Sequence, residues 1–218
     1  MDCGFLYQVQ DRLRRDDKYS NMKTIKINLN KITKDDVSLI VEYLKQGKVI
    51  AYPTDTVYGL GCDCRNVEAI KRIKKIKGEK GIKPLLVLIS DFQMLKKYCF
   101  VNTLQMEYLK KYWPGPVTVV LNLKKNLPRE LTAGTSSLAV RLPKSEFLFK
   151  IITGVGQPIV STSLNISGQK SLNNLNNLDN YFKKVRPDLV VDAGRAKRVK
   201  PSKLVDLRNM TQIKILRK

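Results

Sequence analysis

The chain contains 218 residues, of which 43% are hydrophobic and 28% are charged, as is typical of a globular protein. The absence of histidine excludes Ser-His-Asp and Cys-His catalysis, and no apolar run reaches the roughly 18 residues of a membrane span. The 41 Lys and Arg residues against 19 Asp and Glu give a net charge of +22, which either indicates a polyanionic partner or reflects a lysine-rich composition. With no membrane span and no signal peptide, we expect a cytoplasmic protein without a membrane partner.

The first 21 residues differ from the rest of the chain. They are polar and show no sustained hydrophobic period, whereas a strand-like alternation begins over residues 25–29. We expect residues 1–21 to be a disordered extension, or to precede a true start at Met22, and residues 22–218 to form one domain.

Two amphipathic helices with clear boundaries follow. Thr33, with an aspartate three residues later, is expected to cap a helix that ends at Gly47. Asn66 is expected to cap a second helix that ends at Gly78. Lys77 continues the apolar stripe of this second helix, so its side chain should point toward the sheet. There it either meets a phosphate or extends its charged end back to solvent.

Between these helices lies AYPTDTVYGLGCDC, residues 51–64, in which a strand stops at a proline and polar groups and glycines follow. Cys62 and Cys64 form a CxC pair with no further metal ligands nearby. We therefore expect reduced thiols rather than a zinc site, and no metal bound by the protein itself.

The remaining sequence alternates between strand and helix patterns. A run without alternation, PLLVLIS, is expected to form a strand covered on both faces. The predicted strands are 49–52, 84–90, 117–123, 138–143, 158–164, 189–194, 203–208 and 213–216. The predicted helices are 91–98, 103–112, 146–153 and 179–185, with an asparagine-rich loop over 173–180. This order predicts a single α/β (α+β) domain, a twisted mixed sheet surrounded by helices.

Two further places carry polar groups on strands. Ser163 and Asn165 are two residues apart, so they should share one face, where they form either a turn or a ligand site. Arg141 projects to the opposite side from Leu138 and Val140, and burial there would be costly unless an anion pairs with it. No GxxxxGK[ST] or GxGxxG motif is present, so a bound nucleotide would be held by other means.

Five segments together resemble the YrdC-type threonylcarbamoyl-AMP synthases. They are PTDTVYGLG, YWPGPVTVVL, TAGTSSLAVRLP, PIVSTSLNISG and KPSKLVDL, in the order and spacing of that family. The resemblance runs from about Lys48 to Arg217 and matches the single-domain (TsaC) form. It implies a YrdC-like domain with a basic concave cavity.

The resemblance implies a nucleotidyltransferase that joins L-threonine, bicarbonate or CO2, and ATP into threonylcarbamoyl-AMP and pyrophosphate, with Mg2+ accompanying ATP. A partner complex then transfers the threonylcarbamoyl group to adenosine 37 of tRNA (t6A modification). The residues implied for L-threonine are Thr54, Arg141, Ser161 and Ser202. Those implied for ATP are Lys77, Ser163, Asn165 and Arg217. Thr54 and Thr56 would face the cavity, while Gly59 and Gly61 would let the backbone pass close to a ligand.

One position departs from the family pattern. The family has an arginine two residues after the site lysine, and this chain has Glu79 there. A carboxylate facing polyphosphate is repulsive, so Lys80 or Lys83 would have to supply the lost charge, and we expect Lys83 to do so. The alternative is a weakened or non-catalytic module of the same fold that binds RNA or a nucleotide through its basic surface.

Overall fold

The computed structural model describes residues 22–79, 81, 83–172, 174–176, 178–182, 185–195 and 201–218. The predicted extension, residues 1–21, and Lys80 lie outside the described residues. Within them the strands are β1 (Lys23–Lys26), β2 (Ile50–Tyr52), β3 (Gly59–Asp63), β4 (Leu86–Leu88), β5 (Val117–Asn122), β6 (Ser137–Arg141), β7 (Ile159–Ser163), β8 (Leu189–Asp192), β9 (Lys203–Asp206) and β10 (Lys214–Arg217).

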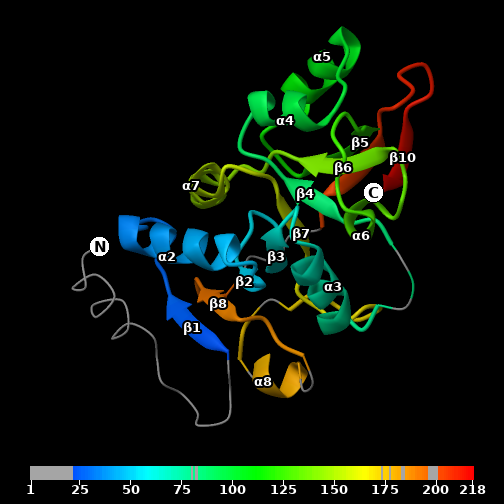
Figure 1. Ribbon diagram of the computed structural model, residues 1–218. Coiled ribbons are helices and arrows are strands. Elements are labelled where there is room, and N and C mark those ends of the chain that lie inside the picture. Colours follow the sequence, from blue (N-terminus) through cyan, green and yellow to red (C-terminus); the bar gives the residue numbers. More distant parts are fainter. Residues whose placement is uncertain are drawn as a thin grey trace.

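The described strands form one mixed sheet in the order β1-β8-β2-β3-β7-β4-β6-β5-β9-β10. The sheet contains both parallel pairs, such as β4 with β6, and antiparallel pairs, such as β3 with β7. The mixed sheet predicted from the sequence is therefore confirmed. Figure 1 shows β1 and β10 at opposite ends of the molecule, with β3, β7 and β4 in the middle.

Seven helices are seen in the described part of the chain: α2 (Lys34–Lys45), α3 (Val67–Ile76), α4 (Phe92–Tyr98), α5 (Thr103–Tyr112), α6 (Arg129–Thr132), α7 (Glu146–Val155) and α8 (Leu178–Tyr181). α2 packs against α7, and α3 packs against α6 and β3; Figure 1 places these two groups on opposite sides of the middle of the sheet. None of the helices within the described ranges is long and apolar enough to cross a membrane.

Local signals in the sequence set both predicted helix starts. Thr33 accepts a hydrogen bond from the backbone of Asp36, whose carboxylate accepts one from the backbone of Thr33 in return, so the capping box is complete. Asn66 caps α3 by accepting from the N–H of Ala69. In PLLVLIS, Val87, Leu88 and Ile89 are all buried, as expected for a strand covered on both faces.

Three elements differ from the sequence prediction. β3 was not predicted, although it lies at the centre of the sheet between β2 and β7. α6, a single turn, was also not predicted. The predicted asparagine-rich loop over 173–180 was partly wrong, because α8 begins at Leu178, and α8 ends at Tyr181 rather than at Val185. Short elements of this kind depend on tertiary contacts more than on local propensity.

The sheet is strongly curved. β3 and β10 are six strand positions apart, which would separate them by about 29 Å in a flat sheet with strands about 4.8 Å apart. Yet Gly59 of β3 and Arg217 of β10 line the same cavity. The sheet therefore curls so that its distant strands face a common space.

Candidate functional site

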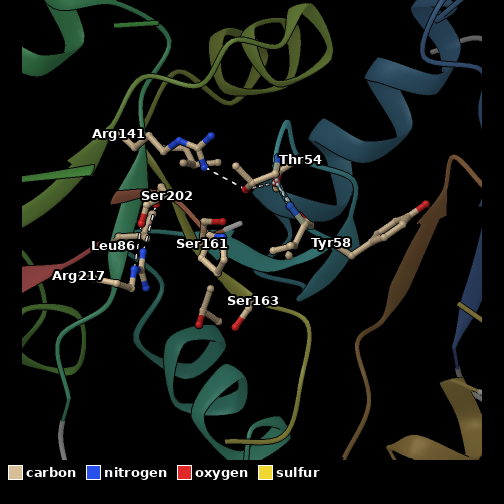
Figure 2. Close-up of a pocket in the computed structure, with 14 residues that line it drawn as sticks. Thr54, Tyr58, Leu86, Arg141, Ser161, Ser163, Ser202 and Arg217 are labelled. Atoms are coloured by element: carbon tan, nitrogen blue, oxygen red, sulfur yellow. Dashed lines mark hydrogen bonds between the residues drawn. The ribbon is translucent and has the colours of Figure 1, made fainter. Parts of the chain in front are cut away.

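A cavity of about 140 Å³ lies at the centre of the molecule, over β3, β7, β4 and β6. It receives side chains from the β2–β3 loop, the middle strands and the two C-terminal strands, and Figure 2 shows them converging around Ser161. Six of the residues predicted for substrate binding line it: Thr54, Arg141, Ser161, Ser163, Ser202 and Arg217. Thr56, Tyr58, Leu86 and Leu88 also line it; the prediction that Thr56 faces a cavity is thus confirmed.

Thr54 organises the turn after β2. Its hydroxyl donates to the carbonyl of Val57 at 2.6 Å and accepts from the N–H groups of Thr56 and Val57 at 3.1 and 3.2 Å. Such short-range hydrogen bonds stabilise a tight turn without regular secondary structure. The chain leaves β2 at Pro53, turns back through this loop and returns as β3, so both threonines are held at the cavity wall.

Arg141 is a buried cation at the end of β6, with only 4% of its surface exposed. Its Nη2 forms an ion pair with Oδ2 of Asp55 at 2.6 Å, and Nε donates to the carbonyl of Gly115 at 3.0 Å. Nη1 donates to the hydroxyl of Thr56 at 3.3 Å. Burial lowers the pKa of Arg141, and the negative charge of Asp55 counteracts that shift. Contacts to the described residues use three of the five N–H groups, which leaves two for a ligand.

Asp55 is the functional residue that sequence reasoning missed. The sequence had required an anion beside a buried Arg141, and Asp55 supplies it from within the chain. Its Oδ2 also accepts from the N–H of Lys144, while Oδ1 is buried and has no hydrogen-bond partner among the described residues. The signal was present, because Asp55 is the one acid in the polar loop that follows β2.

The C-terminal part of the chain closes the opposite wall. Arg217 donates from Nε to the carbonyl of Ser202 at 2.9 Å and from Nη2 to the Ser202 hydroxyl at 3.1 Å. The Ser202 hydroxyl also bonds Thr118 of β5 at 2.8 Å. Burial lowers the pKa of Arg217. Ser202 and Arg217, which were predicted for L-threonine and for ATP respectively, are therefore brought together at the cavity by contacts between β5, β9 and β10.

Two glycines of β3 have different roles. A Cβ on Gly59 would lie 3.4 Å from the Ser161 hydroxyl and from Thr54, so this glycine makes room in the cavity wall. A Cβ on Gly61 would lie only 2.6 Å from Cε1 of Tyr52 and 2.8 Å from the carbonyl of Val160. The prediction that Gly61 serves a ligand is therefore wrong, because the close neighbour is the ring of Tyr52.

Lys77 follows α3 and is 4% exposed, so the prediction that it points inward is confirmed. Its ammonium group donates to the carbonyls of Ser163 and Asn165 at 3.0 and 3.1 Å and to Oδ1 of Asn165 at 2.9 Å. The Ser163 hydroxyl donates to the same Oδ1 at 2.5 Å, so Ser163 and Asn165 share a face as predicted. Burial lowers the pKa of Lys77, and the charge of Glu79 counteracts the shift. Lys77 and Asn165 thus stand directly behind Ser163, outside the cavity lining.

The structure does not bring Lys83 to the cavity. Its side chain is exposed, and its carbonyl accepts from Nζ of Lys74 at 3.0 Å. Glu79 is half-buried close to Lys77, and within the described part of the chain its buried Oε2 has no hydrogen-bond partner. Compensation of Glu79 by Lys83 remains a prediction that requires the segment containing Lys83 to move.

No group of three or more Cys, Asp or Glu side chains able to hold a metal occurs among the described residues. Cys62, Cys64 and Cys99 are buried free thiols. The described lining of the cavity carries two arginines, several hydroxyl groups and no carboxylate. Such a wall can bind an anionic ligand through charge and hydrogen bonds, with Leu86 and Leu88 as its apolar part.

The chain that forms this cavity is similar in sequence to known proteins. A sequence model of the Sua5/YciO/YrdC family, described as telomere recombination, matches residues 42–218. A threonylcarbamoyl-AMP synthase of Pyrococcus abyssi is 33% identical over 187 residues, which cover 84% of this chain and 54% of the relative. A threonylcarbamoyl-AMP synthase of Klebsiella pneumoniae is 34% identical over 180 residues, which cover 81% of this chain and 94% of the relative.

Solved structures show the same architecture. The structure of P. abyssi Sua5 complexed with L-threonine matches with a TM-score of 0.74 and 30% identity, covering 85% of this chain and 54% of that one. Escherichia coli YciO matches with a TM-score of 0.79 and 26% identity, covering 90% and 94% of the two chains. This chain therefore spans about half the length of the P. abyssi protein but nearly the whole of the shorter bacterial ones.

Proposed function

The chain belongs to the Sua5/YciO/YrdC family, and we propose that it is an L-threonylcarbamoyladenylate synthase. The reaction joins L-threonine, bicarbonate or CO2, and ATP into threonylcarbamoyl-AMP and pyrophosphate. The observation that carries this proposal is the gathering of Thr54, Arg141, Ser161, Ser202 and Arg217 around one cavity. They come from separate segments of the sequence, so their convergence is a property of the fold.

The chemistry needs positioned cations more than a reactive side chain. The amine of threonine attacks CO2, forming an N–C bond and losing a proton, and yields a carbamate. A carbamate oxygen then attacks the α-phosphorus of ATP, and the bond from that phosphorus to the β,γ-pyrophosphate breaks. The second step brings two anions together, the carbamate and the triphosphate, so holding them close while offsetting their charge lowers the barrier. A chain without histidine can perform this task with the guanidinium and hydroxyl groups that line its cavity.

The two arginines divide the substrates between them in this proposal. Arg141 offers its two remaining N–H groups to the carboxylate of threonine, and Thr54 and Ser202 line the same cavity from opposite walls. Arg217 faces ATP from the edge strand β10. Ser163 contacts the phosphates, while Lys77 and Asn165 hold the segment that carries it.

We expect Mg2+ to bind together with ATP. Because no cluster of metal ligands occurs in the described part of the chain, the triphosphate oxygens would bind the ion and the protein would bind the complex. When bound, Mg2+ neutralises charge on the leaving pyrophosphate.

The product is a mixed anhydride, so it needs an acceptor that captures it before water does. We place the protein before a tRNA threonylcarbamoyl-transferase complex that modifies adenosine 37, in the cytoplasm. The net charge of +22 would favour direct contact with tRNA as well.

The test is incubation of the purified protein with ATP, Mg2+, bicarbonate and L-threonine. Pyrophosphate that appears only with threonine supports the synthase, and omission of bicarbonate should reduce it. The second candidate, a non-catalytic RNA- or nucleotide-binding module, draws on Glu79, whose carboxylate stands beside Lys77 where the family pattern has an arginine. Salt-dependent RNA binding without threonine-dependent pyrophosphate would favour that module.

A further inference from the structure

The hydroxyl of Tyr52 reaches the cavity from behind a neighbouring strand. Tyr52 lies on β2, opposite Gly59 of β3, and Ser161 lies on β7, opposite Gly61 of β3. The phenol nevertheless donates a hydrogen bond to the Ser161 hydroxyl at 2.8 Å. The ring must cross β3 to do so, and it passes where a Cβ on Gly61 would stand 2.6 Å away.

This contact decides the direction of the Ser161 hydroxyl proton. Tyr52 is 1% exposed and donates in this contact, and burial raises its pKa, so the phenol keeps the proton that it donates. Since the oxygen of Ser161 accepts from Tyr52, its own O–H must point elsewhere. Ser161 lines the cavity, and no acceptor for its hydroxyl is found among the residues that the structure describes. The proton is therefore available to a ligand.

The cavity determines what kind of ligand that proton would meet. Its described walls carry Arg141 and Arg217 and no acid, so an anionic oxygen is the favoured occupant. Resting on the proposed function, we propose that Tyr52 is a positioning residue that fixes the Ser161 hydroxyl as a hydrogen-bond donor to the carboxylate of bound L-threonine. Gly61 is required for the same arrangement, because only glycine at this position leaves room for the tyrosine ring.

A double-mutant cycle on the full chain tests this. The dissociation constant of L-threonine is measured by calorimetry for wild type, Y52F, S161A and Y52F/S161A. We expect Y52F to raise the dissociation constant of L-threonine about fivefold to tenfold, which corresponds to the loss of one hydrogen bond. S161A should weaken the binding of L-threonine at least as much as Y52F does. The double variant should bind L-threonine with the same affinity as S161A alone. Affinity for ATP should change by less than about twofold in all three variants.

Two controls separate positioning from a general effect on the fold. L-threoninamide lacks the carboxylate, so its affinity should be nearly equal in wild type and Y52F. Tyr98 of α4 is also buried, at 5% exposure, but does not line the cavity; Y98F should bind L-threonine as wild type does. Should Y52F fold poorly, G61A, whose Cβ would displace the Tyr52 ring, should weaken the binding of L-threonine but not that of L-threoninamide.

The outcomes are distinct. The inference would be overturned if the Y52F substitution weakened L-threonine binding equally in wild type and in S161A. It would also be overturned if Y52F bound L-threonine with the wild-type affinity. In either case wild type could still release pyrophosphate, so the proposed function would stand. Conversely, wild type that binds L-threonine without producing pyrophosphate would contradict the proposed function while the cycle still reports on Tyr52. Wild type that does not bind L-threonine would contradict both.

Discussion

Asp55 and Arg141 form an ion pair across 86 residues of sequence, with 2.6 Å between Oδ2 and Nη2. Arg141 lines the cavity, and side-chain exposure is 13% for the aspartate and 5% for the arginine. It therefore fixes the cation that we assign to the threonine carboxylate.

Removal of one partner from this pair should be costly. D55N keeps the shape of the side chain but leaves a buried charge unpaired, so we expect the free energy of unfolding to fall by about 3 kcal/mol. D55N/R141M should recover part of that loss because it buries no unpaired charge. Urea denaturation measures both. The exposed pair Glu146–Lys150 provides the control, since E146Q should leave stability unchanged.

Lys77 should stabilise the segment around Ser163 and Asn165, to which it donates hydrogen bonds. K77M removes three hydrogen bonds to Ser163 and Asn165, and we expect the free energy of unfolding to fall by about 2 kcal/mol. Amide exchange over residues 163–169 should accelerate as well. K75M, on the exposed side of α3, is the matched control. Unchanged exchange in K77M would show that the segment does not depend on the lysine.

The two glycines of β3 should respond differently to alanine. G61A places a Cβ 2.6 Å from the ring of Tyr52 and 2.8 Å from a backbone carbonyl, so it should cost about 2–3 kcal/mol of stability. In G59A the nearest atom is 3.3 Å away, and the loss should be smaller. Thermal unfolding ranks the two variants, and an equal loss would contradict the contact between Gly61 and Tyr52.

Because Cys62, Cys64 and Cys99 are buried, the protein should lose folding stability at alkaline pH. Burial, aided by the charge of Asp63, raises the pKa of Cys64 to about 12, whereas a thiol in the unfolded chain titrates near ~8.5. Above that pH the unfolded chain releases a proton that the folded chain retains, so stability falls as pH rises. The stability of wild type relative to C64A should decrease by about 2 kcal/mol between pH 7 and pH 10. I73V, which removes no titratable group, should show a pH-independent difference.

Lys83 provides the test of the departure at Glu79. If its segment moves to bring the ammonium group toward ATP, K83A should raise the KM for ATP on the order of tenfold while the KM for threonine stays unchanged. K96A, on the exposed surface of α4, should behave as wild type. Pyrophosphate release from K83A at the wild-type rate and KM would end the idea of compensation.

The sequence predicted the parts of this structure that depend on local chemistry. The caps at Thr33 and Asn66 and the inward direction of Lys77 follow from spacing along one helix, and the structure confirms them. β3 was missed because Gly59 and Gly61 weaken any strand pattern, and the reason for glycine at position 61 is a ring on another strand. No local pattern carries such information.

The candidate site was predicted unevenly for a similar reason. Motif resemblance indicated the residues that gather at the cavity, including Arg141 and Ser202. It did not indicate their internal partners, Asp55 and Thr118, because pairing across the sheet becomes visible only when the strand order is known. The physical argument that a buried arginine requires an anion was correct, but it could not say which anion.

The curvature of the sheet has a consequence for biosynthesis. The cavity is bounded on one side by the Thr54 loop and on the other by Arg217, which belongs to β10, a strand that is translated after all the other described strands. A nascent chain on the ribosome can pair its middle strands long before that arginine emerges. The complete binding site therefore forms only once translation has passed residue 217, and ligand cannot assist the earlier stages of folding.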